Sequence, residues 1–140
     1  MTIEEFSSFI QTKSVGRWTS VSNEQLIERV YSASRRIGMD TVPLKWVYEK
    51  EIEYTALRRL DEHSWIRVPH KATYGTGEDV DIEEGLVDAL AYLVLSGLEL
   101  QRTKALMHLY YIEIENYNDN LINTHLSKST NNAERFKKFP

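Results

Sequence analysis

Two consecutive helical patterns in the second half of the chain limit its possible folds more than any other feature. Between residues 82 and 98, apolar residues recur at helical spacing over a wide stripe, which predicts a helix buried on much of its circumference. The next pattern runs from about residue 100 to residue 122 and predicts a helix roughly 33 Å long, at ~1.5 Å per residue. Because almost no chain separates them, these helices should pack as a hairpin.

Acidic residues before the first of these patterns predict where its helix begins. Asp79 or Asp81 should cap the helix, and Glu83 and Glu84 should lie in its first turn, where carboxylates suit the helix dipole. The apolar faces of the predicted helices then indicate a shared core. Its expected members are Leu26, Val30, Ile37, Leu86, Leu90, Leu93, Leu106, Leu109 and Tyr117.

Two further helices are predicted nearer the N-terminus, and each begins with a capping box. Thr2 with Glu5 has this form and precedes a short amphipathic pattern over about residues 3–12. Ser22 with Gln25 repeats the form before a longer amphipathic pattern. In both boxes a side-chain oxygen satisfies a backbone N–H that has no partner within the helix.

The region after Gly38, a glycine expected to end the preceding helix, is richer in residues that favour strands. Within residues 44–70, the runs Tyr54–Leu60 and Trp65–Val68 are separated by a polar turn. This arrangement predicts a β-hairpin or a small antiparallel sheet. A helix over Trp46–Leu60 is the alternative, since several residues of that run tolerate one.

Composition excludes several classes of protein. A chain of 140 residues that is 41% hydrophobic is long and apolar enough for one domain with a core. Its net charge of −4 is unlike that of a general nucleic-acid coat protein. Absence of cysteine excludes thiol nucleophiles, disulfides, iron–sulfur clusters and cysteine-based zinc sites. The longest apolar region, Leu86 to Leu100, is interrupted by polar residues and is shorter than the ~20 residues of a membrane span.

Motifs that carry chemistry are weak throughout the sequence. Gly75 and Gly77 lack the downstream Gly and Lys of a nucleotide-binding loop, so a tight turn explains them better. His108 and Glu115 lie two turns apart on one predicted helix, but such a pair is common by chance. We therefore expect no enzyme, no cofactor and no metal site.

The C-terminal segment, from residue 125 onward, differs in composition from the rest of the chain. It is polar and without periodicity, and it ends in a basic tip with two phenylalanines, on an otherwise acidic protein. Such a tail could bind nucleic acid, stay solvated or become ordered on a protein partner. The phenylalanines favour a partner, because they offer anchors. The expected docking residues are Lys128, Arg135, Phe136, Lys137, Lys138 and Phe139.

These patterns together predict a mainly α protein. A single domain over residues 1–124 should form a small helical bundle on a long central helical hairpin. A β insertion is expected at about residues 44–70, and an extended, flexible docking tail at residues 125–140.

Three stretches of the sequence resemble one family of viral structural proteins. The first is the helical run over residues 25–38, which ends in a basic residue, an aliphatic residue and glycine. The second is Trp65–Pro69 followed by the acidic entry and helix of residues 79–92. The third is the long helix through Tyr110, Tyr111 and Tyr117 with its polar tail. Over residues 22–140 the chain is similar to the head-to-tail connector proteins, also called adaptor or head-completion proteins, of tailed bacteriophages.

That resemblance implies a structural role in the virion neck, after synthesis in the host cytoplasm. Such proteins form a ring of twelve subunits below the portal, bind the portal and a tail or second neck protein, and are not enzymes. DNA passes through their channel without sequence-specific binding. The tail would dock on the portal, and the β region would contact neighbouring subunits or tail components. The β residues expected in these contacts are Tyr54, Leu57, Trp65 and Ile66.

A small helical regulatory or nucleic-acid-binding protein is the alternative function. Arg29, Arg35 and Arg36 on the second predicted helix could form a recognition element. However, a β-rich stretch follows this helix directly, and no helix-turn-helix spacing is visible.

Overall fold

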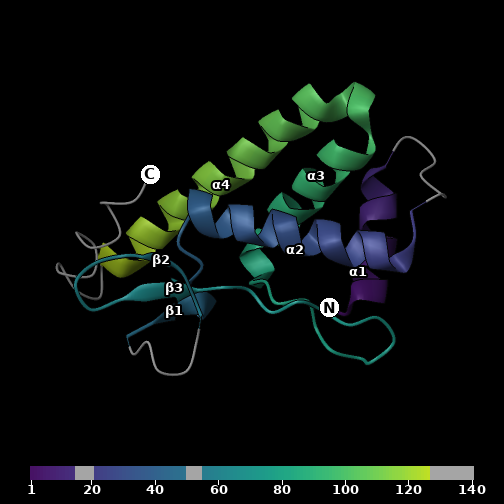
Figure 1. Cartoon of the computed structure of the whole chain (residues 1–140). Helices are drawn as coiled ribbons and strands as arrows, with labels where there is room; N and C mark the ends of the chain where they lie inside the picture. Colours follow the sequence, from purple (N-terminus) through teal and green to yellow (C-terminus); the bar gives the residue numbers. More distant parts are fainter. Residues whose placement is uncertain (15–20, 50–54, 127–140) are drawn as a thin grey trace.

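The computed structural model describes residues 1–14, 21–49 and 55–126. Over this part of the chain the protein is mainly helical, with a small three-stranded antiparallel sheet, which confirms the predicted class (Figure 1). The helices are α1 (Ile3–Lys13), α2 (Asn23–Asp40), α3 (Val87–Leu98) and α4 (Thr103–Leu126). The strands are β1 (Val47–Tyr48), β2 (Ala56–Arg59) and β3 (Trp65–Arg67), and single 3₁₀ turns occupy Leu44–Trp46, Glu84–Leu86 and Leu100–Arg102.

Both predicted capping boxes are confirmed. The Thr2 hydroxyl accepts the backbone N–H of Glu5 and the Glu5 carboxylate accepts that of Thr2, so α1 begins where the sequence predicts. Ser22 and Gln25 make the same reciprocal pair at the start of α2.

The predicted end of α2 at Gly38 is wrong. The helix continues to Asp40, and Thr41 follows it in an extended conformation. Gly38 is buried inside the last turn, where the ring of Trp46 and the side chain of Leu57 fill the space next to its Cα. Here glycine allows the close approach of another element, which local sequence does not distinguish from a helix end.

The predicted start of α3 also needs correction. Neither Asp79 nor Asp81 caps it, because a 3₁₀ turn at Glu84–Leu86 precedes the helix and the Asp81 carboxylate is bonded elsewhere. α3 contacts α1, α2 and α4, and most of its residues are buried, as the wide apolar stripe predicts. In Figure 1 α2 passes across α3, and α3 and α4 run side by side.

α4 begins after a 3₁₀ turn and ends at Leu126, four residues beyond the predicted end. Leu106, Tyr110 and Ile114 are buried, but Leu109, a predicted core residue, is 36% exposed. At about 100° per residue, Leu109 lies on the flank of the buried stripe rather than on it. Tyr117, also predicted for the core, is only partly buried.

The predicted β-hairpin is confirmed. β2 and β3 pair antiparallel, and β1 adds a third strand, so the region forms a small antiparallel sheet with the order β1-β3-β2. The alternative helix over Trp46–Leu60 is wrong for the described part of that run, which holds the end of a 3₁₀ turn and two strands. Ile66, on the central strand, is fully buried with Val42, Trp46 and Leu121 in a small second core beneath the sheet.

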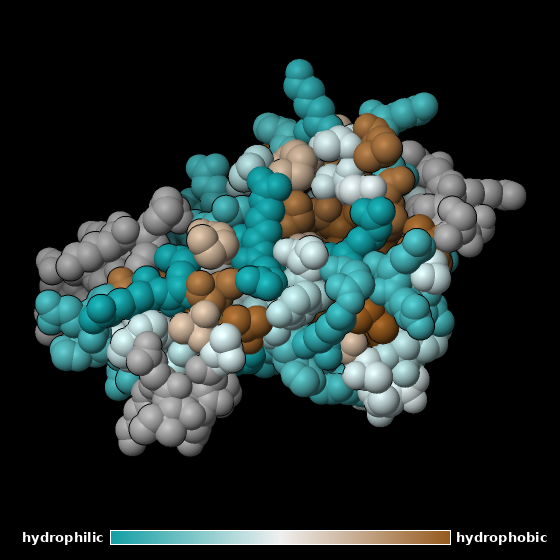
Figure 2. All heavy atoms as spheres, in the orientation of Figure 1, coloured by the Kyte–Doolittle hydropathy of each residue, from teal (hydrophilic) through white to brown (hydrophobic). Residues whose placement is uncertain are grey.

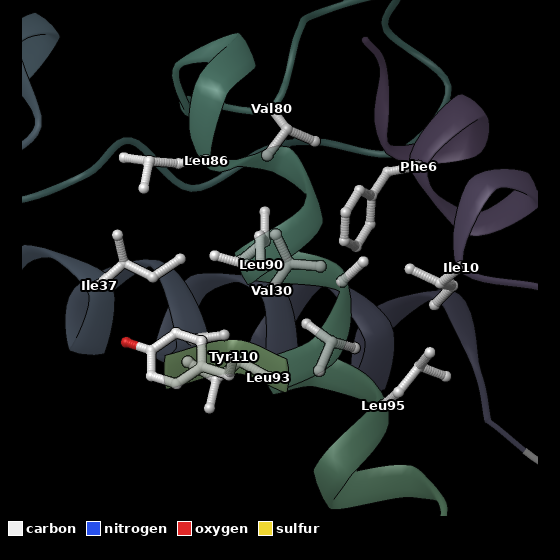
Figure 3. Packing of buried hydrophobic residues seen from close by; sticks show 14 of the residues in the cluster. Phe6, Ile10, Val30, Ile37, Val80, Leu86, Leu90, Leu93, Leu95 and Tyr110 are labelled. Atoms are coloured by element: carbon white, nitrogen blue, oxygen red, sulfur yellow. The ribbon is translucent and has the colours of Figure 1, made fainter. Parts of the chain in front are cut away.

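The main core lies where α1, α2 and α4 meet α3. Figure 3 shows Leu90 and Val30 near its centre, with Phe6 and Ile10 entering from α1 and Tyr110 from α4. Of the nine residues predicted for the core, Leu26, Val30, Ile37, Leu86, Leu90, Leu93 and Leu106 are buried. The 3.6-residue period therefore identifies most of the buried side chains.

Gly38→Ala should lower the free energy of unfolding by about 1–3 kcal/mol, because overpacking a filled site strains its neighbours. A Cβ there would lie 2.5 Å from Cδ2 of Leu57 and 3.1 Å from the Trp46 ring. Urea denaturation measures the effect. Gly85→Ala is the control, since its Cβ would meet Tyr117 at an ordinary 3.6 Å. Equal losses in the two variants would contradict the packing assigned to Gly38.

Candidate functional site

A buried carboxylate links the sheet to the segment that enters α3. The side chain of Asp81 is 7% exposed and accepts a hydrogen bond from Nη2 of Arg67, on β3, at 3.0 Å. Nε1 of Trp46 donates to it at 3.1 Å, and the backbone N–H of His70 donates at 2.7 Å. Lys45 adds an ion pair at 3.5 Å. One side chain thus joins the 3₁₀ turn after α2, β3 and the loop after β3.

These contacts determine the charge of Asp81. Burial alone would raise the pKa of this carboxyl group, but the hydrogen bonds from Arg67, His70 and Trp46 outweigh burial and lower the pKa to about 2. A carboxylate that is ionised at neutral pH and occupied by several donors is a poor proton acceptor. Asp81 is therefore a structural anion rather than a general base.

Two tyrosines fix α4 to the rest of the protein. The hydroxyl of Tyr110 donates to Asp40 at 2.6 Å, and that of Tyr117 donates to Glu83 at 2.6 Å. Burial is the larger cause that raises the pKa of each phenol, and the adjacent carboxylate raises this pKa further. Both hydroxyls therefore stay neutral in the physiological range. These bonds hold the middle part of α4, at two positions about two turns apart, to α2 and to the segment before α3.

An open cleft of about 1050 Å³ lies between α2, the end of the sheet and the loop after β3. Tyr31 and Arg35 line it from α2, and Lys45, Arg67 and Lys71 line it from the other side. Most of these cations already have acidic partners: Arg67 and Lys45 pair with Asp81, and Lys71 pairs with Glu28. Arg35 forms no ion pair with another described residue and lies 5.7 Å from the centre of the Tyr31 ring. The cleft therefore offers one guanidinium to an anionic ligand.

The outer face of α4 leaves large apolar side chains in solvent. Leu109 and Ile112 are 36% and 39% exposed, and Tyr111 is 50% exposed. Tyr111 contacts Arg36 on α2, whereas Leu109 and Ile112 lie together on the other flank of the helix, where no described element covers them. Sequence reasoning missed this surface because it assigned Leu109 to the core, although the helical period itself places Ile112 away from Tyr110.

The four β residues predicted for inter-subunit or tail contacts do not form one exposed surface. Ile66 is fully buried and Leu57 is half-buried against the second core. Trp65 is half-buried. The centre of its ring lies 6.1 Å from the centre of the Tyr48 ring and 5.6 Å from the guanidinium carbon of Arg59. Tyr54 lies outside the described residues. Among the other three, Trp65 is the residue that could extend to a neighbour, whereas Ile66 serves the core.

The predicted docking residues of the tail all lie outside the described residues. They are Lys128, Arg135, Phe136, Lys137, Lys138 and Phe139. The helix that leads to them is described to Leu126, and it ends near the sheet in Figure 1.

Within residues 1–14, 21–49 and 55–126, no group of three or more His, Asp or Glu side chains is arranged to hold a metal ion. Gly75 and Gly77 both have positive φ angles, of 81° and 74°, which confirms that they serve a tight turn. The same described residues contain no helix with the length and apolar character needed to cross a bilayer. No family model matches the chain, and no curated protein or solved structure matches it.

Proposed function

We propose that this chain is a structural virion protein of a tailed bacteriophage. It forms an oligomeric ring that joins the capsid portal to the tail and leaves a channel for DNA. The ring has twelve subunits, its further partner is a tail or second neck protein, and the protein has no enzymatic role. The resemblance over residues 22–140 motivates this proposal.

The observation that carries the proposal is the uncovered apolar face of α4. A monomer leaves Leu109 and Ile112 partly in water, which costs free energy that a permanent neighbour would recover. Obligate assemblies bury surfaces of this kind. A protein that works as one subunit of a ring has a reason to keep such a face, whereas a protein that acts alone does not.

The charge of the chain is also consistent with a DNA channel. A net charge of −4 limits contacts with phosphates, so DNA can slide through without being held. In this proposal the basic tail faces the portal rather than the channel.

Mass spectrometry of purified virions and of the separated neck assembly tests the function. We expect the chain in the neck fraction at the same copy number as the other ring proteins. Phage without it should accumulate DNA-filled heads that carry no tails. Its absence from purified virions would contradict the proposal.

Removal of residues 127–140, a cut that keeps α4 whole, should leave a folded domain that no longer joins portal-containing particles. Ordering a segment costs about 1–2 kcal/mol per residue, so the tail needs a partner that buries its phenylalanines and pairs its basic residues. Co-sedimentation with heads measures the loss. The matched control keeps the tail and replaces Phe136 and Phe139 by leucine, which retains apolar anchors and should retain most of the binding. Normal assembly of the truncated protein would show that the tail has no docking role.

A nucleic-acid-binding protein is the second candidate. Arg35 favours it, because this residue lies in the cleft beside Tyr31 and forms no ion pair with the part of the chain that the structure describes. In that case binding to DNA would weaken steeply as salt rises, because phosphate contacts release counterions. The neck function instead predicts no measurable binding to DNA at physiological salt, and a fluorescence titration at several salt concentrations separates the two.

A further inference from the structure

A second, smaller groove lies between α2 and α3, on a different side of the molecule from the cleft. It has a volume of about 350 Å³ and an apolar floor made by Ala33, Leu93 and Val94. Figure 2 shows apolar side chains gathered over α3 beside α2, with hydrophilic side chains around them. A groove with this floor accepts apolar side chains from a helix.

Two arginines are held in place at the rim of this groove. Arg29 donates from Nη1 to the backbone carbonyl of Gly97 at 3.3 Å, and a Cβ at Gly97 would lie 2.9 Å from that nitrogen. Glycine at this helical position thus makes room for the guanidinium. Arg36 donates to the hydroxyl of Tyr111 at 2.7 Å. Glu28, the acid that lines the groove, is already paired with Lys71. Arg36 also forms an ion pair with Asp40 at 3.5 Å, so Arg29 is the rim arginine that has no acidic partner among the described residues. The rim therefore presents the positive charge of Arg29.

The exposed stripe of α4, defined here as Leu109 and Ile112, points away from this groove. At about 100° per residue, Tyr110 faces the core, Tyr111 faces Arg36 on α2, and the stripe lies on the opposite flank. Glu113, Glu115 and Asp119 are close to it on the same helix, and none forms an ion pair with another described residue. The stripe is thus apolar, and the acids beside it have no cationic partner within the described ranges.

We propose that the α4 stripe of one copy packs into the α2/α3 groove of the next copy. Apolar side chains of the stripe meet the apolar floor, and the carboxylates of α4 meet Arg29 on the rim. Because stripe and groove lie on different faces of one chain, the contact is head-to-tail and can repeat from copy to copy. This inference rests on the proposed function, for which it supplies the contact that builds the ring.

Stripe-to-stripe pairing, which would make a closed dimer, is the competing arrangement. It would bring the acids of two α4 helices together and leave Arg29 without a carboxylate from the neighbouring copy. Charge complementarity therefore favours packing of the stripe in the groove over pairing of two stripes.

Because the chain contains no cysteine, single introduced cysteines can detect the contact without background. Ser32→Cys places a thiol on an exposed position of the groove, and Ile112→Cys places one on the stripe. The two full-length variants are mixed at about 100 µM each, and disulfide formation is followed under mild oxidation. We expect the mixture to form the 32–112 disulfide about ten-fold faster than a random pair, since a docked partner supplies millimolar effective concentration.

Ser8→Cys, exposed on α1, mixed with Ile112→Cys gives the random rate. Adding Arg29→Glu to the Ser32→Cys chain should remove most of the acceleration. Arg35→Glu, on the same helix but lining the other cleft, should leave it unchanged. The proposal is overturned if the 32–112 pair forms no faster than the 8–112 pair, or if Ile112→Cys alone is as fast as the mixture. In either case the presence of the wild-type chain in virion necks would still support the proposed function, so the two failures can be told apart.

Discussion

Replacing Asp81 by alanine should lower the free energy of unfolding by about 3–5 kcal/mol, because it removes the buried carboxylate that pairs with the largely buried Arg67. The same change removes the acceptors of the Trp46 indole and the His70 backbone N–H, and these donors then lose their partner inside the protein. Urea denaturation followed by tryptophan fluorescence measures the loss.

Asp79→Ala is the matched control for Asp81→Ala. Asp79 lies two residues earlier but its side chain is 69% exposed, so its ion pair with the amino group of Met1 should contribute less than about 1 kcal/mol. Similar losses in the two variants would mean that the carboxylate of Asp81 does not organise the loop and sheet as described.

The contribution of Asp81 should also depend on pH in a defined direction. Its pKa is about 2 in the folded protein against an ordinary value of 3.8, so folding favours the ionised form. The stabilisation is complete above about pH 4 and is lost as the pH falls through the folded pKa near 2. The stability difference between wild type and Asp81→Ala should therefore be constant from pH 5 to 7 and shrink by about 2 kcal/mol toward pH 2. A difference that grew at low pH would contradict the assignment.

Leu90→Ala should cost about 2–5 kcal/mol, because it empties the centre of the main core where the surrounding helices relax only partly. Leu90 is fully buried on α3, the helix that contacts all three others. Circular dichroism during urea unfolding gives the change in free energy.

Leu100→Ala is the control for Leu90→Ala, since it removes the same atoms from a side chain that is 77% exposed. We expect a change below about 0.5 kcal/mol for this control. A loss that small for Leu90 would mean that the buried face of α3 is wrongly identified.

Features that depend on neighbours along the chain can be predicted from the amino-acid sequence of this protein. Thr2 with Glu5 and Ser22 with Gln25 set the starts of α1 and α2, because a capping box is complete within four residues. Hydrophobic periodicity predicts the buried faces of α2 and α3, and the polar turn between two apolar runs predicts the β2–β3 hairpin.

Features that depend on residues far apart in the sequence are set by contacts of the folded protein. Gly38 looks like a helix end, but it remains inside α2 because Trp46 and Leu57 pack against it. Asp81 looks like a helix cap, but Arg67 and Trp46 offer it stronger partners than an N-terminal backbone amide. Leu109 has the residue type of a core position and stays exposed because no other described element covers that side of α4. In each case the energy of a nonlocal contact exceeds the local preference, and that contact exists only once the helices and the sheet have come together.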